Sequence, residues 1–99
     1  MSAYVIFICK QLKSKEHFNQ YNRLAREASK GFDIKVRSFY GQVEALENIA
    51  AEGVAILEFV DLAQAQAWYQ SEAYQEAKKQ RDLAGDYIVL ITEGLNIPS

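Results

Sequence analysis

The apolar run near the start of the chain restricts the fold more than any other part of the sequence. Residues 3–9 read AYVIFIC, and side chains along a strand point alternately to the two faces of its sheet. Val5 and Phe7 would then share one face, while Tyr4 and Ile6 share the other. Both faces of this strand are apolar, so the sheet that contains it needs cover on both sides.

Three further strands are predicted, at residues 34–40, 54–60 and 87–92. The last of them is apolar on both faces, like the first. The run at 34–40 alternates polar and apolar side chains, which is typical of a half-exposed strand near the edge of a sheet. Its expected faces are Ile34, Val36, Ser38 and Tyr40 on one side and Lys35, Arg37 and Phe39 on the other.

Helix signals fill the gaps between these strands. Ser14 is a suitable N-cap for a helix that Gly31 would end. The polar face of this helix is expected to carry Glu16, Asn19, Arg23, Arg26, Glu27 and Lys30. Asp61, with a glutamine three residues later, begins a second helix in the manner of a capping box. Ser71, with a glutamate directly after it, repeats the capping signal, so this second region is predicted to be two helical pieces joined near Gln70 and Ser71.

The resulting order is β-α-β-β-α-β, the ferredoxin-like arrangement of the α+β class, in which two helices cover one face of an antiparallel four-stranded sheet. The chain of 99 residues suits a single domain spanning residues 1–99. Because the helices cover only one face, an identical subunit is the simplest cover for the other. We therefore expect a homodimer whose sheet faces pack together, the arrangement of a dimeric α+β barrel.

The composition excludes several classes of partner and site. The formal net charge of −2 argues against binding nucleic acid through a basic face. The first apolar run is too short for a membrane span and lacks the preceding basic segment of a signal peptide, so a cytoplasmic location with no membrane partner is expected. The single cysteine, Cys9, is predicted to be a small buried side chain. With His17 as the single histidine, no metal site is expected.

The most specific motif in the chain is AWYQSEAYQ at residues 67–75, because aromatic side chains at these spacings around a serine are uncommon by chance. Shorter elements accompany it: AYVIF at 3–7, EALE at 44–47, ILEF at 56–59, Arg81, and TEG at 92–94. Together they resemble the family called domain of unknown function 1330 (DUF1330), in the dimeric α+β barrel superfamily. The resemblance implies a small cytoplasmic bacterial protein. The superfamily includes cofactor-independent monooxygenases, lactone isomerases and stress-responsive proteins, so the fold alone does not select an activity.

A candidate site lies where aromatic side chains are expected to turn toward the sheet. Tyr21, Trp68 and Tyr74 are on such helix faces, where aromatic side chains most often form core, but a buried tyrosine hydroxyl also needs a hydrogen-bond partner. Arg81 follows Tyr74 at the helical spacing i, i+7 and shares its face. It either points to solvent or turns inward, where its guanidinium would suit a carboxylate. Turned inward, it would form with the tyrosines the polar end of an apolar small-molecule pocket.

His17 and Glu58 are further candidate site residues, and each has an ordinary alternative. His17 lies near a helix start at the edge of the apolar stripe, either on the surface or as an acid or base at the edge of the pocket. Glu58 interrupts an apolar strand, either as a carboxyl with a perturbed pKa or as the partner of Lys35 or Arg37 across the sheet.

Three functions stay open at this point. The first is a dimeric protein that binds a small, partly apolar or anionic metabolite in a pocket between helices and sheet. The second is a cofactor-independent monooxygenase- or isomerase-like enzyme that uses Tyr21, Tyr74, His17 or Glu58 for proton transfer. The third is a structural or interaction protein without a ligand. The sequence has no glycine-rich phosphate loop, CxxC pair or nucleophile elbow, so no cofactor is expected.

Overall fold

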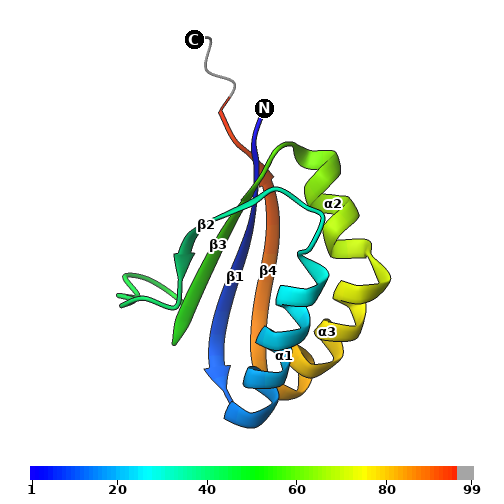
Figure 1. Cartoon of the computed structure of the whole chain (residues 1–99). Helices are drawn as coiled ribbons and strands as arrows, with labels where there is room; N and C mark the ends of the chain where they lie inside the picture. Colours follow the sequence, from blue (N-terminus) through cyan, green and yellow to red (C-terminus); the bar gives the residue numbers. More distant parts are fainter. Residues whose placement is uncertain (96–99) are drawn as a thin grey trace.

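The computed structural model describes residues 1–95, which form a four-stranded sheet and three helices (Figure 1). The strands are β1 (Ala3–Leu12), β2 (Ile34–Phe39), β3 (Gly53–Phe59) and β4 (Gly85–Glu93). The helices are α1 (Lys15–Ala28), α2 (Leu62–Gln70) and α3 (Glu72–Ala84). This order confirms the predicted ferredoxin-like α+β arrangement, with the second helical region divided in two.

The sheet is antiparallel, and its strands lie in the order β2-β3-β1-β4. β2 is therefore an edge strand, as its alternation predicts. Val5 of β1 pairs with Leu57 of β3 and with Ile91 of β4, so apolar side chains form a continuous row across one face. The helices lie over one face of the sheet, and no helix within residues 1–95 covers the other (Figure 1).

The joint between α2 and α3 depends on one side chain. Ser71 is both the C-cap of α2 and the N-cap of α3. Its hydroxyl donates a hydrogen bond to the carbonyl oxygen of Trp68 at 2.7 Å and accepts one from the backbone N–H of Tyr74 at 3.2 Å. Ser71 thereby satisfies a backbone group at the end of one helix and another at the start of the next, which confirms the predicted position of the joint.

α1 begins where the sequence predicts but ends earlier. Ser14 is its N-cap and accepts a hydrogen bond from the backbone N–H of His17. The helix ends at Ala28, and both the backbone N–H and the hydroxyl of Ser29 donate to the carbonyl oxygen of Ala25. Gly31, predicted as the end of the helix, lies in the following turn with a φ of 89°, a left-handed conformation that glycine adopts without strain.

β2 departs from the alternation predicted for it. Its register shifts between Val36 and Ser38. Val36 pairs with Leu57, and Phe39 pairs with Ala55, so Val36 and Phe39 lie on the same face, under α1. The prediction that Phe39 faces away is wrong, because a β-bulge adds one residue to a strand and changes the face occupied by the strand residues that follow it.

The core lies between the helices and the sheet, and the opposite face of the sheet is uncovered. The largest fully buried side chains are Trp68, Tyr74, Phe59 and Val5. On the uncovered face, Ile56 of β3, Ile6 of β1 and Leu90 of β4 form another apolar row across neighbouring strands, and Leu90 is 51% exposed. Both faces of the central sheet are therefore apolar, as the run at residues 3–9 predicts.

Candidate functional site

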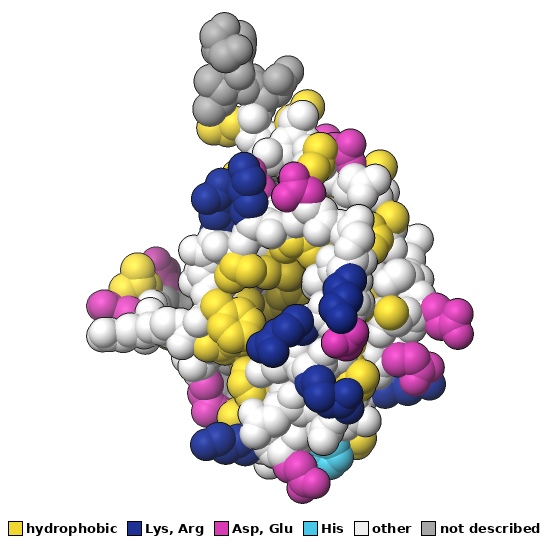
Figure 2. Space-filling view, viewed as in Figure 1, with side chains coloured by type: hydrophobic (Ala, Val, Ile, Leu, Met, Phe, Trp, Pro, Cys, Tyr) yellow, Lys and Arg dark blue, Asp and Glu magenta, His cyan; other side chains and the backbone are white. Residues whose placement is uncertain are grey.

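A cavity of about 480 Å³ opens between α1 and the part of the sheet formed by β2 and β3. Figure 2 shows it as an apolar hollow in the surface, with Lys and Arg side chains along its border and an acidic side chain next to them. Small-molecule sites are usually concave, largely apolar and about 300–1,000 Å³ in volume. The cavity therefore has the size and character of a binding site.

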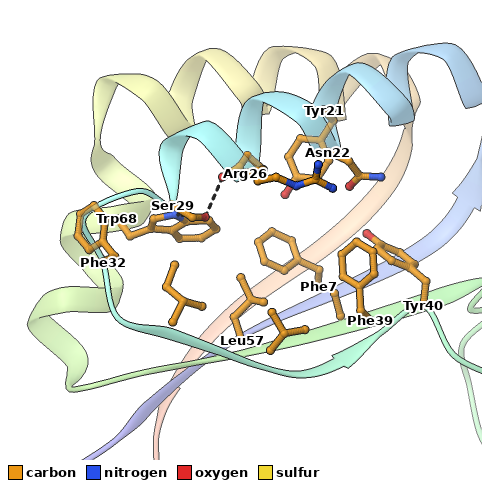
Figure 3. Close-up of a pocket in the computed structure, with 14 residues that line it drawn as sticks. Phe7, Tyr21, Asn22, Arg26, Ser29, Phe32, Phe39, Tyr40, Leu57 and Trp68 are labelled. Carbon is orange, nitrogen blue, oxygen red and sulfur yellow. Dashed lines mark hydrogen bonds between the residues drawn. The ribbon is translucent and has the colours of Figure 1, made fainter.

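The floor of the cavity is apolar and comes from three strands of the sheet. Phe7 of β1, Ala55 and Leu57 of β3, and Ile34 and Val36 of β2 line it. Figure 3 shows Phe7 and Leu57 beneath α1, on the side of the sheet that faces the helix. A ligand would bury apolar surface against this floor.

Trp68 of α2 closes one end of the cavity, near Phe32 (Figure 3). Its ring centre lies 4.2 Å from that of Tyr74 and 5.3 Å from that of Phe59. Its indole N–H donates to the hydroxyl of Ser29 at 3.3 Å. Trp68 is only 1% exposed, so it belongs to the core and also lines the cavity.

Phe39 and Tyr40 lie at the other end of the cavity (Figure 3). Their ring centres are 4.8 Å apart in an edge-to-face arrangement. Tyr40 has a φ of 52°, and its ring packs over Gly53, where a Cβ atom would collide with it. Its hydroxyl lies 3.1 Å from that of Tyr87. Sequence reasoning missed Phe39 because the bulge in β2 turns it toward the helix. Tyr40 was predicted on the same face as Val36, where it lies, but was not selected as a site residue.

α1 supplies most of the polar groups that line the cavity. Asn22, Ala25, Arg26 and Ser29 line it, and their spacing of i, i+3, i+4 and i+7 places them on one face of the helix. Arg26 was predicted on the polar face of this helix and was not among the candidate site residues. The helical spacing of these four side chains is the signal that could have identified it.

A buried chain of hydrogen bonds lies behind the cavity wall. Arg81 Nη1 donates to the hydroxyl oxygen of Tyr74 at 3.0 Å, and the hydroxyl oxygens of Tyr74 and Tyr21 are 2.8 Å apart. Tyr21 lines the cavity, as Trp68 does, whereas Tyr74 and Arg81 do not. The structure thus brings these four predicted residues together, with two at the cavity surface and two behind it.

Arg81 is buried without a buried carboxylate beside it. It is 5% exposed, and its guanidinium carbon lies 5.7 Å from the ring centre of Phe7 and 5.6 Å from that of Tyr87. The carboxylate of Asp82 approaches it only to 3.9 Å and is itself paired with Lys78 at 3.0 Å. Within residues 1–95, Arg81 Nε has no hydrogen-bond partner. Tyrosine hydroxyls and aromatic faces, rather than a close ion pair, surround this charge.

Burial keeps the two linked phenols protonated. Burial, assisted by the neighbouring Tyr74, raises the pKa of Tyr21 well above its usual value. Burial also raises the pKa of Tyr74 to about 12, although the positive charge of Arg81 opposes this rise. At neutral pH both hydroxyls are therefore neutral groups that donate and accept hydrogen bonds, and neither is a phenolate base.

His17 and Glu58 lie away from the cavity. His17 is at the start of α1, where its ring Nδ1 lies 3.0 Å from the hydroxyl of the N-cap serine. Glu58 is on the uncovered face of the sheet and accepts hydrogen bonds from Arg37 Nε at 2.7 Å and from the Ser2 hydroxyl at 2.9 Å. The bond from Arg37, followed by that from Ser2, lowers the pKa of Glu58. Neither candidate shares the cavity with Tyr21.

Metal ligands do not gather in the part of the chain that the structure describes. Among residues 1–95, no three His, Cys, Asp or Glu side chains are placed to hold a metal ion. Cys9 is buried as predicted, and burial raises the pKa of its thiol. Among the same residues, no helix has the length and apolar character needed to cross a membrane.

Comparison with protein families gives one match over nearly the whole chain. The model described as "Domain of unknown function (DUF1330)" matches residues 2–95. No curated protein matches the sequence.

Several solved structures share the fold at low sequence identity. A protein of unknown function from Rhodopseudomonas palustris is 17% identical, with a TM-score of 0.63 over 97% of this chain and 84% of that one. A dimeric ferredoxin-like protein of unknown function from Jannaschia sp. is 10% identical, with a TM-score of 0.64 over 95% of this chain and 100% of the other. A cofactor-independent oxygenase from Streptomyces nogalater is 12% identical, with a TM-score of 0.60 over 99% of this chain and 97% of the oxygenase chain. These likenesses show the ferredoxin-like fold alone.

Proposed function

The chain belongs to the DUF1330 family, and we propose that its function is to bind a small, mostly apolar metabolite in the cavity between α1 and the sheet. The observation that carries this proposal is the cavity of about 480 Å³, with an apolar floor and polar groups from one face of α1. Protein interiors are closely packed and leave few voids larger than a water molecule. An open apolar hollow of this size is typical of a ligand-binding site.

Calorimetric titration with 2-naphthoate as the probe tests this proposal. We expect the wild-type protein to bind one probe molecule per chain. Ala25→Phe places a large ring in the cavity, because Ala25 lines it, and should abolish binding. Ala67→Phe makes the same change at an exposed position of α2 and should leave binding unchanged. A wild-type protein that binds neither 2-naphthoate nor its neutral amide, or an Ala25→Phe variant that binds normally, would contradict the proposal.

We further propose that two copies associate through the uncovered faces of their sheets. The support is the apolar row of Ile56, Ile6 and Leu90 on that face, together with the dimeric state stated for the similar protein from Jannaschia sp.. Burying such a row against a second copy would remove apolar surface from water.

Light scattering at micromolar concentration tests the association. The wild-type protein should have the mass of a dimer, and Ile6→Lys should have that of a monomer, because a buried lysine without a partner is costly. Leu83→Lys changes a side chain that is 57% exposed on α3 and should remain dimeric. A monomeric wild-type protein would reject the proposed association.

An oxygenase- or isomerase-like activity is the second candidate function. The likeness to the cofactor-independent oxygenase from Streptomyces nogalater and the place of Tyr21 among the residues that line the cavity favour it. With its raised pKa, Tyr21 would serve as a hydrogen-bond donor to a substrate oxygen and not as a base. Dioxygen uptake with 1-naphthol as the probe, higher in the wild type than in Tyr21→Phe, would support this activity. Uptake equal to that of a protein-free blank would count against it.

A further inference from the structure

The electrostatic surroundings of the cavity favour a negatively charged ligand. Arg26 lines the cavity, and it makes no ion pair within residues 1–95. Arg81 places a second positive charge behind the wall. In the part of the chain that the structure describes, no Asp or Glu side chain lines the cavity. The two positive charges therefore act on a ligand without an opposing carboxylate in the lining of the cavity.

The hydrogen-bond chain connects the charged side chain of Arg81 to Tyr21, which lines the cavity. Two hydrogen bonds, of 3.0 Å and 2.8 Å, separate Arg81 Nη1 from the hydroxyl oxygen of Tyr21. Because Arg81 can only donate, the oxygen of Tyr74 accepts from it, and either phenol can be the donor in the bond between Tyr74 and Tyr21. When Tyr74 donates to Tyr21, the hydrogen of Tyr21 is free for an acceptor in the cavity. A chain of donors that begins at a cation strengthens the last donor.

An anion nearby would also stabilise the buried guanidinium of Arg81. Burying a charge costs free energy unless other groups compensate for it. Arg81 has tyrosine hydroxyls and aromatic rings around it, and the carboxylate of Asp82, 3.9 Å away, is exposed and shared with Lys78. An anion bound at Tyr21 would offset part of this cost in a region where water screens charges weakly.

We propose that the ligand is a carboxylate on an apolar ring system, held by the hydroxyl of Tyr21 and the guanidinium of Arg26. Both side chains extend from α1 at the cavity (Figure 3). The apolar body of the ligand lies against Phe7 and Trp68. Arg81 is a positioning residue that acts through Tyr74. This inference rests on the proposed function of the cavity and specifies its ligand class.

A pair of probes that differ in charge but hardly in shape tests the inference. 2-Naphthoate is an anion at neutral pH, whereas 2-naphthamide is neutral. In calorimetric titrations of the wild-type protein, we expect naphthoate to bind at least about tenfold more tightly, a ratio that corresponds to about 1.4 kcal/mol. Added sodium chloride should weaken the binding of naphthoate more than that of naphthamide, because salt screens charges.

Matched variants test the individual residues. Arg26→Gln should weaken naphthoate binding several-fold and leave naphthamide binding unchanged. Arg23→Gln removes the same charge from the same helix, but Arg23 is exposed, bonds to Gln20 and does not line the cavity, so it should change neither. Tyr74→Phe should weaken naphthoate alone, because it interrupts the chain from Arg81 without altering the lining of the cavity.

The outcomes separate this inference from the proposed function. Equal wild-type affinity for both probes would overturn the carboxylate inference and leave a binding cavity. Failure of both probes to bind would overturn the inference and the proposed function together. Equal loss of both probes in Tyr74→Phe would show a general structural effect and reject the role assigned to Arg81.

Discussion

The hydroxyl oxygens of Tyr21 and Tyr74 lie 2.8 Å apart although the two residues are 53 positions apart in the sequence. Their hydrogen bond joins α1 to α3 in the buried layer above the sheet. Tyr74 also accepts the bond from Arg81, so one hydroxyl serves two partners. A change at this hydroxyl is therefore expected to affect both stability and ligand binding, and both can be measured in the same variants.

Tyr74→Phe should lower the free energy of unfolding by about 1–3 kcal/mol, because Arg81 Nη1 loses a buried hydrogen-bond partner. Urea denaturation measures the difference. Tyr69→Phe is the matched control, since its hydroxyl lies 3.5 Å from Arg81 Nη2, at the limit of a hydrogen bond, and its removal should cost less. Equal losses in the two variants would contradict the special role of Tyr74.

Trp68→Ala should lower the free energy of unfolding by about 3–5 kcal/mol, the usual cost of removing a large buried aromatic side chain. Trp68 packs against Tyr74 and Phe59 in the core. Leu83→Ala removes a side chain that is 57% exposed and should change stability by less than about 0.5 kcal/mol. The same denaturation experiment compares them, and a loss below about 1 kcal/mol for Trp68→Ala would show that its packing contributes little.

Ser71→Ala should lower the free energy of unfolding by about 0.5–2 kcal/mol, because α3 loses its N-cap. Thermal or urea unfolding measures the loss. Ser71→Asp keeps an acceptor for the backbone N–H of Tyr74 but cannot donate to the carbonyl oxygen of Trp68, as the serine hydroxyl does. It should therefore be less destabilising than alanine. If aspartate and alanine cost the same, the cap is not the source of the loss.

Alkaline pH should destabilise the protein before its buried tyrosines ionise in the folded state. Burial raises the pKa of Tyr74 to about 12, whereas an unfolded tyrosine titrates near about 10. The stability that comes from keeping this phenol neutral is present below about pH 10 and is lost as the pH rises toward about 12. The free energy of unfolding, measured across this pH range, should fall more steeply for the wild type than for Tyr74→Phe. Phenolate absorbance, recorded in parallel, follows the ionisation of the tyrosines. Equal slopes would contradict the assignment.

Acid pH should remove a contribution from Glu58. The hydrogen bond from Arg37 holds the pKa of this carboxyl below its usual value. The contribution is therefore present above the unfolded pKa, near about 4.3, and is lost as the pH falls through the lower folded value. Titration of the side-chain carboxyl by NMR should show the lowered pKa. Arg37→Gln should raise that pKa more than Lys35→Gln does, and the reverse order would rule out Arg37 as the main cause.

The elements that could be predicted are those whose signal lies in neighbouring residues of the sequence. Alternating apolar side chains at residues 3–9 indicated a strand with two apolar faces, and a capping serine at position 71 indicated the joint between helices; the structure confirms both. The bulge in β2 could not be predicted in this way, because a register shift depends on how β2 pairs with β3. As a result, Phe39 was assigned to the wrong face.

The candidate site was predictable only in part. The aromatic residues Tyr21, Trp68 and Tyr74 followed from helical spacing, and they do lie together. Arg26 was missed because a charged side chain on an amphipathic helix is normally assigned to solvent. The orientation of Arg81 stayed open because it belongs to a charged run on α3, and its burial depends on tyrosines and rings contributed by other parts of the fold.

The position of Trp68 gives the protein an optical property. It is the single tryptophan of the chain, its ring lines the cavity, and its indole N–H bonds to Ser29. Tryptophan emission therefore originates from the wall of the cavity and from nowhere else in the molecule. The intrinsic fluorescence of the unlabelled protein should change when a ligand displaces water beside this ring, so unknown metabolites can be screened without attaching a dye.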